Sequence, residues 1–145
     1  MTDINWLQML AYQQQLHHFA RALLAQGQKR TLTASELEIL SLLYLRTENI
    51  TPLMLSKESG MKKEAVSRCL KQLFERGLIE KNKHPQDERS YVLSITEIGE
   101  KTLSENYGPI LQPLYDLRRS METEFDMLFH LIEIANKKMD AMNEK

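Results

Sequence analysis

The sequence predicts a mainly α-helical fold with one small antiparallel β-hairpin. Apolar residues recur at three- and four-residue steps over most of the 145 residues, which indicates amphipathic helices. Two short segments, 79–83 and 90–95, read as strands, and Pro85 lies in the loop that joins them. Two short helices separated by Gly60 precede this hairpin. This order of elements predicts a winged helix-turn-helix whose hairpin is the wing, flanked by N- and C-terminal helices.

The first two helices have recognisable boundaries. We expect one helix over residues 4–26, closed by Gly27, and a second that runs from Leu37 to about Arg46. Thr33 and a glutamate three residues later have the spacing of a capping box, in which each side chain accepts from the other residue's backbone N–H. The second helix is apolar nearly all round, so it should lie at the centre of the fold.

The helix-turn-helix follows. Thr51, with a proline after it, is typical of a helix start, and Gly60 ends that helix. A longer helix is expected over 62–76, closed by Gly77. Ser56 supplies the small side chain that two crossing helices need. The apolar residues that should face inward from the turn and the longer helix are Met61, Val66, Cys69, Leu70 and Leu73.

The opposite face of the longer helix is cationic and hydroxylic. Arginine binds guanine edges bidentately, and lysine or serine can contact bases or phosphates. Residues 57–89 carry a local charge of +3 within a chain of net charge −1. A solvated lysine face would look similar, but the position after a helix-turn-helix favours a major groove of DNA. The residues expected to contact it are Lys62, Lys63, Ser67, Arg68 and Lys71.

The C-terminal part should be helical over 97–108, after a cap at Thr96, and again over 122–142. We expect Pro109 and Pro113 to bend or interrupt the chain between them, unless either proline lies in a first helical turn. The chain is thus one domain, 1–145, with a DNA-binding core over 31–99 and a helical region formed by 1–27 and 100–145.

The run from Leu55 to Gly99 resembles the winged-helix core of the MarR family of bacterial transcription regulators. That family has Val-(Ser/Thr)-Arg in the recognition helix, and Asp-x-Arg followed by Leu-Thr-x-x-Gly in the wing. The chain departs from the family at Ser56, where Ala is usual, at His84, where Asp is frequent, and at Ile95, where Leu is usual. The matching residues are Val66-Ser67-Arg68, Asp87-Glu88-Arg89 and Ile95-Thr96-Glu97-Ile98-Gly99.

The resemblance implies that the recognition helix reads the major groove of a double-stranded DNA operator while Arg89 reaches into the adjacent minor groove. Asp87 is then expected to hold the guanidinium of Arg89 bidentately. The alternative is a surface salt bridge within the loop that contributes little to stability, since the same two residues would form it. The wing residues assigned to DNA contact are Lys83, His84, Asp87 and Arg89.

The resemblance also implies a homodimer, which reads a palindromic operator with half-sites about 34 Å apart and acts as a repressor. The terminal helices carry more apolar surface than one wing domain can cover. They either intertwine with a second chain or pack within one chain. The residues concerned are Leu10, Leu16, Phe19, Leu23, Phe125, Phe129, Ile132 and Met139.

MarR relatives often release DNA when a small phenolic or lipophilic effector binds. Residues that could line an effector pocket are Trp6, Tyr12, His18 and Tyr44, although aromatic side chains at helical spacing also serve as core or dimer packing. Cys69, the single cysteine, reads as a small buried hydrophobe. A thiol-responsive regulator acting through Cys69 is the alternative.

Other function classes lack support. There is no glycine-rich phosphate loop, nucleophile elbow or helix-borne metal motif, so we expect no enzyme and no cofactor. His17 and His18 diverge by about 100° on a helix, which argues against a metal site. A single cysteine, no signal peptide and no membrane-spanning run predict a cytoplasmic protein. The remaining rival is a winged-helix protein-interaction module, whose outward helix face would be apolar or acidic.

Overall fold

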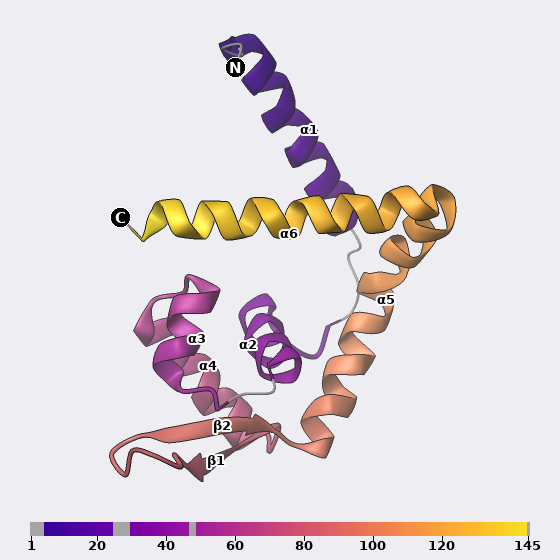
Figure 1. The fold of residues 1–145 in the computed structure, drawn as a ribbon. Helices are drawn as coiled ribbons and strands as arrows, with labels where there is room; N and C mark the ends of the chain where they lie inside the picture. Colours follow the sequence, from indigo (N-terminus) through magenta and orange to yellow (C-terminus); the bar gives the residue numbers. More distant parts are fainter. Residues whose placement is uncertain (1–4, 25–29, 47–48, 145) are drawn as a thin grey trace. The chain divides into compact units, whose positions relative to one another are not determined.

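The computed structural model describes residues 5–24, 30–46 and 49–144. The chain divides into two compact units, and each is described by itself: the core unit, Gln28–Pro109, and the terminal unit, Met1–Gly27 with Ile110–Lys145. The mainly helical fold with a small antiparallel hairpin is confirmed (Figure 1). Its elements are α1 (Trp6–Leu24), α2 (Ala34–Leu45), α3 (Pro52–Ser59), α4 (Lys63–Glu75), β1 (Ile79–Lys83), β2 (Tyr91–Ile95), α5 (Glu97–Met121) and α6 (Thr123–Asn143).

Local side-chain caps start the helices of the core unit. At α2, the Glu36 N–H donates to Thr33 Oγ1 at 3.1 Å and the Thr33 N–H donates to Glu36 Oε1 at 3.4 Å, which is the predicted capping box. At α3, Thr51 Oγ1 accepts from the Met54 N–H at 3.3 Å. Gly60 ends α3 with φ 71°, a left-handed conformation that favours glycine.

The start of α1 differs from our prediction. It begins at Trp6 because Asn5 is its N-cap, with Asn5 Oδ1 accepting from the Gln8 N–H at 3.0 Å. Asparagine is a common N-cap, so the sequence contained this signal and our prediction of a start at residue 4 missed it. The predicted end at residue 26 and its closure by Gly27 lie outside the described residues.

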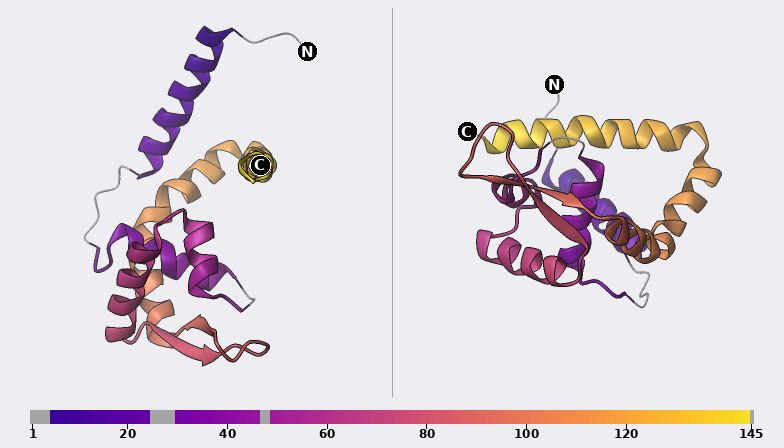
Figure 2. Two further views of the ribbon diagram at one scale, coloured as in Figure 1. Left: turned by 90° about the vertical axis from the view of Figure 1, so that its left-hand side faces the viewer. Right: turned by 90° about the horizontal axis from the view of Figure 1, so that it is seen from below.

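The core of the wing domain is built around α2, as expected from its apolar sequence. The largest fully buried side chains come from α2, α3 and α4, which form one cluster of helices in Figures 1 and 2. The hairpin lies along one side of this cluster, and its tip projects beyond the helices (Figures 1 and 2). These buried side chains are Ile39, Leu40, Leu55 and Leu73.

The wing is a regular antiparallel ladder in which Ile79 pairs with Ile95 and Lys83 pairs with Tyr91. A third segment extends it on one side, because the Leu93 N–H donates to the Ile50 carbonyl at 2.8 Å. The connection between α2 and α3 is thereby joined to the hairpin, which gives the wing a fixed root.

We predicted a bend or an interruption at Pro109 and Pro113, and the interruption is wrong. α5 is one helix from Glu97 to Met121, and both prolines lie within it. Each proline removes a single N–H donor, and the neighbouring backbone bonds maintain the helix. α6 follows after Glu122, which has φ 55°. None of the described helices combines the length and apolar character required to cross a membrane.

Candidate nucleic-acid interface

The outward side of α4 carries the predicted cationic strip. Val66, Leu70 and Leu73 are buried, so the opposite face of the helix is turned to solvent. In the part of the chain that the structure describes, no cation of this strip has an ion-pair partner within 4.0 Å. The strip therefore presents unpaired charge to an incoming polyanion. Its exposed members are the five residues that the sequence predicted: Lys62, Lys63, Ser67, Arg68 and Lys71.

The turn before α4 is held by serine side chains. Ser56 Oγ donates to the Met61 carbonyl at 2.9 Å, and the Met61 N–H donates to Ser59 Oγ at 3.1 Å. Ser56 was predicted only as a small residue at the helix crossing. Its hydroxyl adds a bond across the turn that the alanine usual in the MarR family would not make.

The Thr-x-x-Gly motif joins the wing to the end of α4. Thr96 Oγ1 donates to the Gly77 carbonyl at 2.7 Å and accepts from the Gly99 N–H at 3.1 Å. The Thr96 N–H donates to the Leu78 carbonyl at 3.0 Å. A Cβ atom on Gly99 would lie 2.1 Å from that same carbonyl oxygen, so only glycine fits. The motif therefore positions the wing relative to α4.

The wing tip contains a correction to our prediction for Asp87. The Asp87 carboxylate accepts from the backbone N–H of Arg89 at 3.0 Å, and the Ser90 N–H donates to the Asp87 carbonyl at 3.2 Å. The ion pairs of the described residues do not include Arg89. A carboxylate bonded to its own loop backbone is a frequent turn arrangement. Asp87 thus orders the loop, and the Arg89 guanidinium keeps its donors for another partner.

The two other wing residues assigned to DNA contact lie beside this turn. Lys83 ends β1 and is exposed, and His84 is half-buried. His84 Nδ1 accepts from the Gln86 N–H at 3.1 Å, so its ring is part of the loop's own hydrogen bonding. Lys83 is consequently the freer of the two.

Lys81 links the wing to α4, which sequence reasoning missed. Its Nζ lies 4.5 Å from the centre of the Tyr91 ring in β2 and 5.3 Å from the centre of the Phe74 ring in α4. Both distances are within the range of cation–π attraction. No local pattern could have found this contact, because it depends on how the hairpin packs against the helix.

Cys69 lies on the inner side of α4 and is half-buried. Burial raises the pKa of its thiol, the Glu36 carboxylate raises that pKa further, and Arg68 opposes the shift. A raised pKa keeps the thiol protonated at neutral pH. Since the thiolate is the reactive form, this environment favours a packing role over a sensing role.

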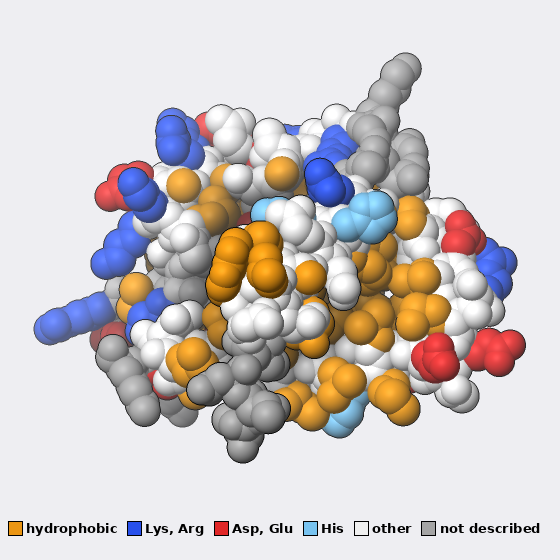
Figure 3. Space-filling view, turned by 90° about the horizontal axis from the view of Figure 1, so that it is seen from above, with side chains coloured by type: hydrophobic (Ala, Val, Ile, Leu, Met, Phe, Trp, Pro, Cys, Tyr) orange, Lys and Arg blue, Asp and Glu red, His pale blue; other side chains and the backbone are white. Residues whose placement is uncertain are grey.

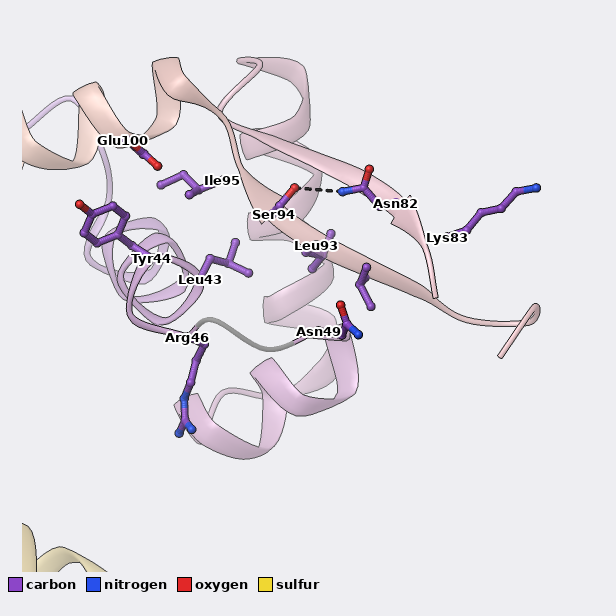
Figure 4. Close-up of a pocket in the computed structure, with 11 residues that line it drawn as sticks. Leu43, Tyr44, Arg46, Asn49, Asn82, Lys83, Leu93, Ser94, Ile95 and Glu100 are labelled. Carbon is purple, nitrogen blue, oxygen red and sulfur yellow. Dashed lines mark hydrogen bonds between the residues drawn. The ribbon is translucent and has the colours of Figure 1, made fainter. Parts of the chain in front are cut away.

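A cleft of about 460 Å³ opens in the core unit between α2 and the hairpin. Leu43, Leu93 and Ile95 form apolar walls, and Ser94 accepts from Asn82 Nδ2 at 3.0 Å at the rim (Figure 4). Tyr44, one of four residues predicted to line an effector pocket, lies here. The structure does not bring all four to this cleft: Tyr12 lines a groove in the terminal unit, and the exposed Trp6 and His18 line neither.

The terminal unit contains an apolar groove of about 390 Å³ between α1 and α6. Tyr12, Leu16 and Phe19 line it from α1, and Leu128 and Ile132 line it from α6. Hydrophobic side chains gather on the face of the molecule shown in Figure 3.

The other residues predicted for a dimer interface lie on the same helices. The rings of Phe125 and Phe129 contact each other, with centroids 4.7 Å apart. Leu23 is half-buried, whereas Leu10 and Met139 are exposed. The predicted interface did not include other exposed apolar residues of α6, which are Met127, Leu131, Ile134 and Met142.

The MarR family model matches residues 32–91, which cover the helix-turn-helix and the wing as far as the start of β2. This matched core is similar to the MarR family of transcription regulators. An uncharacterised HTH-type transcriptional regulator of Bacillus subtilis (strain 168) is 32% identical over 72 residues, which span 50% of this chain and 43% of that protein. The matched part is thus less than half of the curated relative.

Solved structures of the MarR family share the fold over nearly the whole chain. The MarR/EmrR family transcriptional regulator from Acinetobacter sp. ADP1 is 28% identical, with a TM-score of 0.62 over 95% of this chain and 99% of that one. A mutant of MarR from E. coli, complexed with operator DNA, is 18% identical, with a TM-score of 0.65 over 92% of this chain and 99% of that one.

Proposed function

We propose that this protein binds a specific operator in double-stranded DNA and regulates transcription as a repressor. The observation that carries the proposal is the exposed strip of α4, whose cations have no ion-pair partner among the described residues, in the same compact unit as the free guanidinium of Arg89. The MarR structure from E. coli with operator DNA supports the same use of this fold.

In this proposal the two elements read different grooves. Arg68 and Lys71 on α4 contact base edges and phosphates of the major groove, because an α-helix fits that groove. Arg89 at the wing tip enters the neighbouring minor groove, where a narrow A·T-rich segment concentrates negative potential. Asp87 contributes by ordering the loop that carries Arg89, through its bond to the Arg89 N–H.

The protein acts as a homodimer on a palindromic operator. The apolar groove between α1 and α6 and the exposed residues around it supply the contact surface. Two copies related by a two-fold axis present two recognition helices to half-sites about 34 Å apart. One wing domain alone would read too few base pairs to select a site.

Salt titration on duplex DNA tests this proposal. For the wild-type protein we expect affinity to fall steeply with salt, because phosphate contacts release counterions. Arg68→Ala and Arg89→Ala should each weaken binding by about 1–3 kcal/mol. Arg118→Ala is the matched control. It removes the same charge from an exposed position of α5 that belongs to the terminal unit. Duplex binding that is independent of salt and of both arginines would refute the assigned contacts. The absence of any binding to duplex DNA would refute the proposal and favour the protein-interaction module.

A small phenolic or lipophilic effector that releases DNA is the second part of the proposal. The cleft beside Tyr44 supports it, because its volume falls in the usual range of ligand sites. Its lining is mainly polar but includes the apolar side chains of Leu43, Leu93 and Ile95. A thermal-shift screen with such compounds tests it, since a ligand that binds the native state raises the melting temperature. A compound that still raises the melting temperature of the Tyr44→Ala variant binds outside this cleft. Peroxide-insensitive DNA binding would set aside the thiol-responsive alternative at Cys69.

A further inference from the structure

An acidic residue, Glu64, lies inside the cationic strip of α4. It belongs to the first turn of the helix and is exposed. At about 100° per residue, it falls between Lys71 and Arg68 around the helix axis, roughly 20° from the first and 40° from the second. This direction is about opposite to the buried side formed by Val66, Leu70 and Leu73. Glu64 therefore points outward from the middle of the surface that faces DNA in the proposed function.

The carboxylate of Glu64 is not neutralised by its neighbours. Its spacing of four residues from Arg68 would permit an ion pair on the helix surface. Yet the ion pairs of the described residues, counted to 4.0 Å, include neither Glu64 nor Arg68. A free carboxylate beside a duplex is repelled by phosphates, although the N-terminus of α4 favours an acidic side chain in the free protein. In a complex with DNA, a hydrogen bond from a base would offset the repulsion.

The bases differ in what they offer a carboxylate in the major groove. Cytosine presents the N4 amino donor, whereas guanine presents two acceptors and thymine presents an acceptor and a methyl group. Adenine presents the N6 donor beside the N7 acceptor, which repels a carboxylate. Cytosine is thus the base from which an outward glutamate best accepts a hydrogen bond. The glutamate discriminates against the other bases because its carboxylate would then face a hydrogen-bond acceptor of the base.

We infer that Glu64 is a specificity-determining residue that accepts a hydrogen bond from cytosine N4 in each half-site. The inference rests on the proposed function and deepens it, because it names a base that the operator must contain. The N-terminal residues of a recognition helix are those that reach base edges, and Glu64 occupies that end of α4. Glu64 contributes selectivity at the expense of general attraction to phosphates.

Selection from a library of random-sequence duplexes, long enough for two half-sites, tests the inference with the full-length chain. The wild-type protein should select cytosine at one position of each half-site, by about tenfold over other bases. Glu64→Gln should shift that position towards adenine, because a glutamine amide pairs with adenine N6 and N7. Glu64→Ala should lose the preference there and bind random duplexes more tightly.

Glu75→Gln is the matched control. Glu75 is also exposed on the outward side of α4, but it lies eleven residues from Glu64, about 16 Å along the helix. Its neutralisation should raise affinity for random duplexes and leave the selected bases unchanged.

Three negative results have different meanings. A wild-type protein that selects an operator, with the same base at every position in Glu64→Gln and Glu64→Ala, overturns the role of Glu64 and leaves DNA binding intact. A wild-type protein that binds no duplex at low salt refutes the proposed function, and the inference falls with it. A loss of selection shared by Glu75→Gln would also overturn it, because the effect would then be one of net charge.

Discussion

The core unit and the terminal unit differ in how completely they bury their apolar side chains. In the core unit, Ile39 and Leu40 have no exposed surface, and the helices and hairpin enclose them completely. In the terminal unit, α6 has no fully buried residue, and Leu16 of α1 is 68% exposed. The first unit forms an enclosed apolar core within one chain. The second leaves a broad apolar face, of a kind that marks interaction sites, and this is the physical basis for proposing a dimer.

Polar contacts show the same contrast. Asn106 is buried in the core unit, where its Oδ1 accepts from the N–H groups of Thr31 and Leu32 at 3.0 and 3.3 Å. Its Nδ2 donates to Thr31 Oγ1 at 2.9 Å and to the Thr102 carbonyl at 2.8 Å. Such directional bonds specify one packing of α5 against the start of α2. The groove of the terminal unit is instead lined mainly by apolar groups. Apolar contacts are not directional, so a partner of matching shape could pack against this groove.

The largest expected effect is on the core unit. Gly99→Ala should destabilise it by about 3 kcal/mol or more, because the new methyl group would lie 2.1 Å from the Leu78 carbonyl oxygen and the backbone would have to move. Urea unfolding measures the change. Gly108→Ala is the control in the same helix, where a Cβ meets no atom within 4 Å. Equal stability of the two variants would contradict the close approach at Gly99.

The terminal unit should respond through association. Leu16→Glu places a charge in the apolar groove, so we expect dimerisation to weaken by about 2 kcal/mol or more. The helical content of the core unit should remain. Sedimentation over a concentration series measures this, with Gln14→Glu, on the other side of α1, as the control. A dimer of wild-type strength in Leu16→Glu would show that the groove packs within one chain.

A smaller effect concerns the attachment of the wing to the core. Lys81→Met removes the cation from between Phe74 and Tyr91, so DNA binding should weaken by about 1 kcal/mol as the wing loosens. Lys81→Arg should retain most of the affinity, because a guanidinium makes the same kind of contact. Anisotropy titration on the selected operator measures both. An equal loss in both variants would indicate that Lys81 acts otherwise.

The smallest effect is a gain of stability at the turn between α5 and α6. Glu122 has φ 55° and ψ −123°, a conformation that glycine adopts more easily. Glu122→Gly should raise the free energy of unfolding by about 1 kcal/mol. Glu124→Gly, in the first turn of α6, should lower it by a similar amount, because glycine is a poor helix former and the variant loses an acidic side chain that a helix N-terminus favours. Thermal unfolding of both variants shows whether each substitution raises or lowers the free energy of unfolding.

Much of the fold could be predicted from sequence because its signals are local. The capping box at Thr33, the start at Thr51 and the left-handed Gly60 each involve residues within a few positions of one another. The cationic strip was predictable for the same reason, because helical periodicity separates its residues from Val66, Leu70 and Leu73. Periodicity also places Glu64 on that strip, but our prediction of DNA contacts included only cations and hydroxyls.

The sequence by itself determined which segments become helices and strands and which face of each is apolar, since these follow from backbone caps and side-chain period. Only the tertiary structure decided that Asp87 bonds the loop backbone instead of the Arg89 guanidinium, and that α5 continues through two prolines. It also decided that Gly99 meets Leu78 and that Lys81 meets Phe74. The contacts of Gly99 and Lys81 join different elements, so they depend on how those elements pack, and no local pattern records that packing. The Asp87 bond is local, but the loop sequence permits both that bond and an ion pair with Arg89, and only the conformation of the loop decides between them.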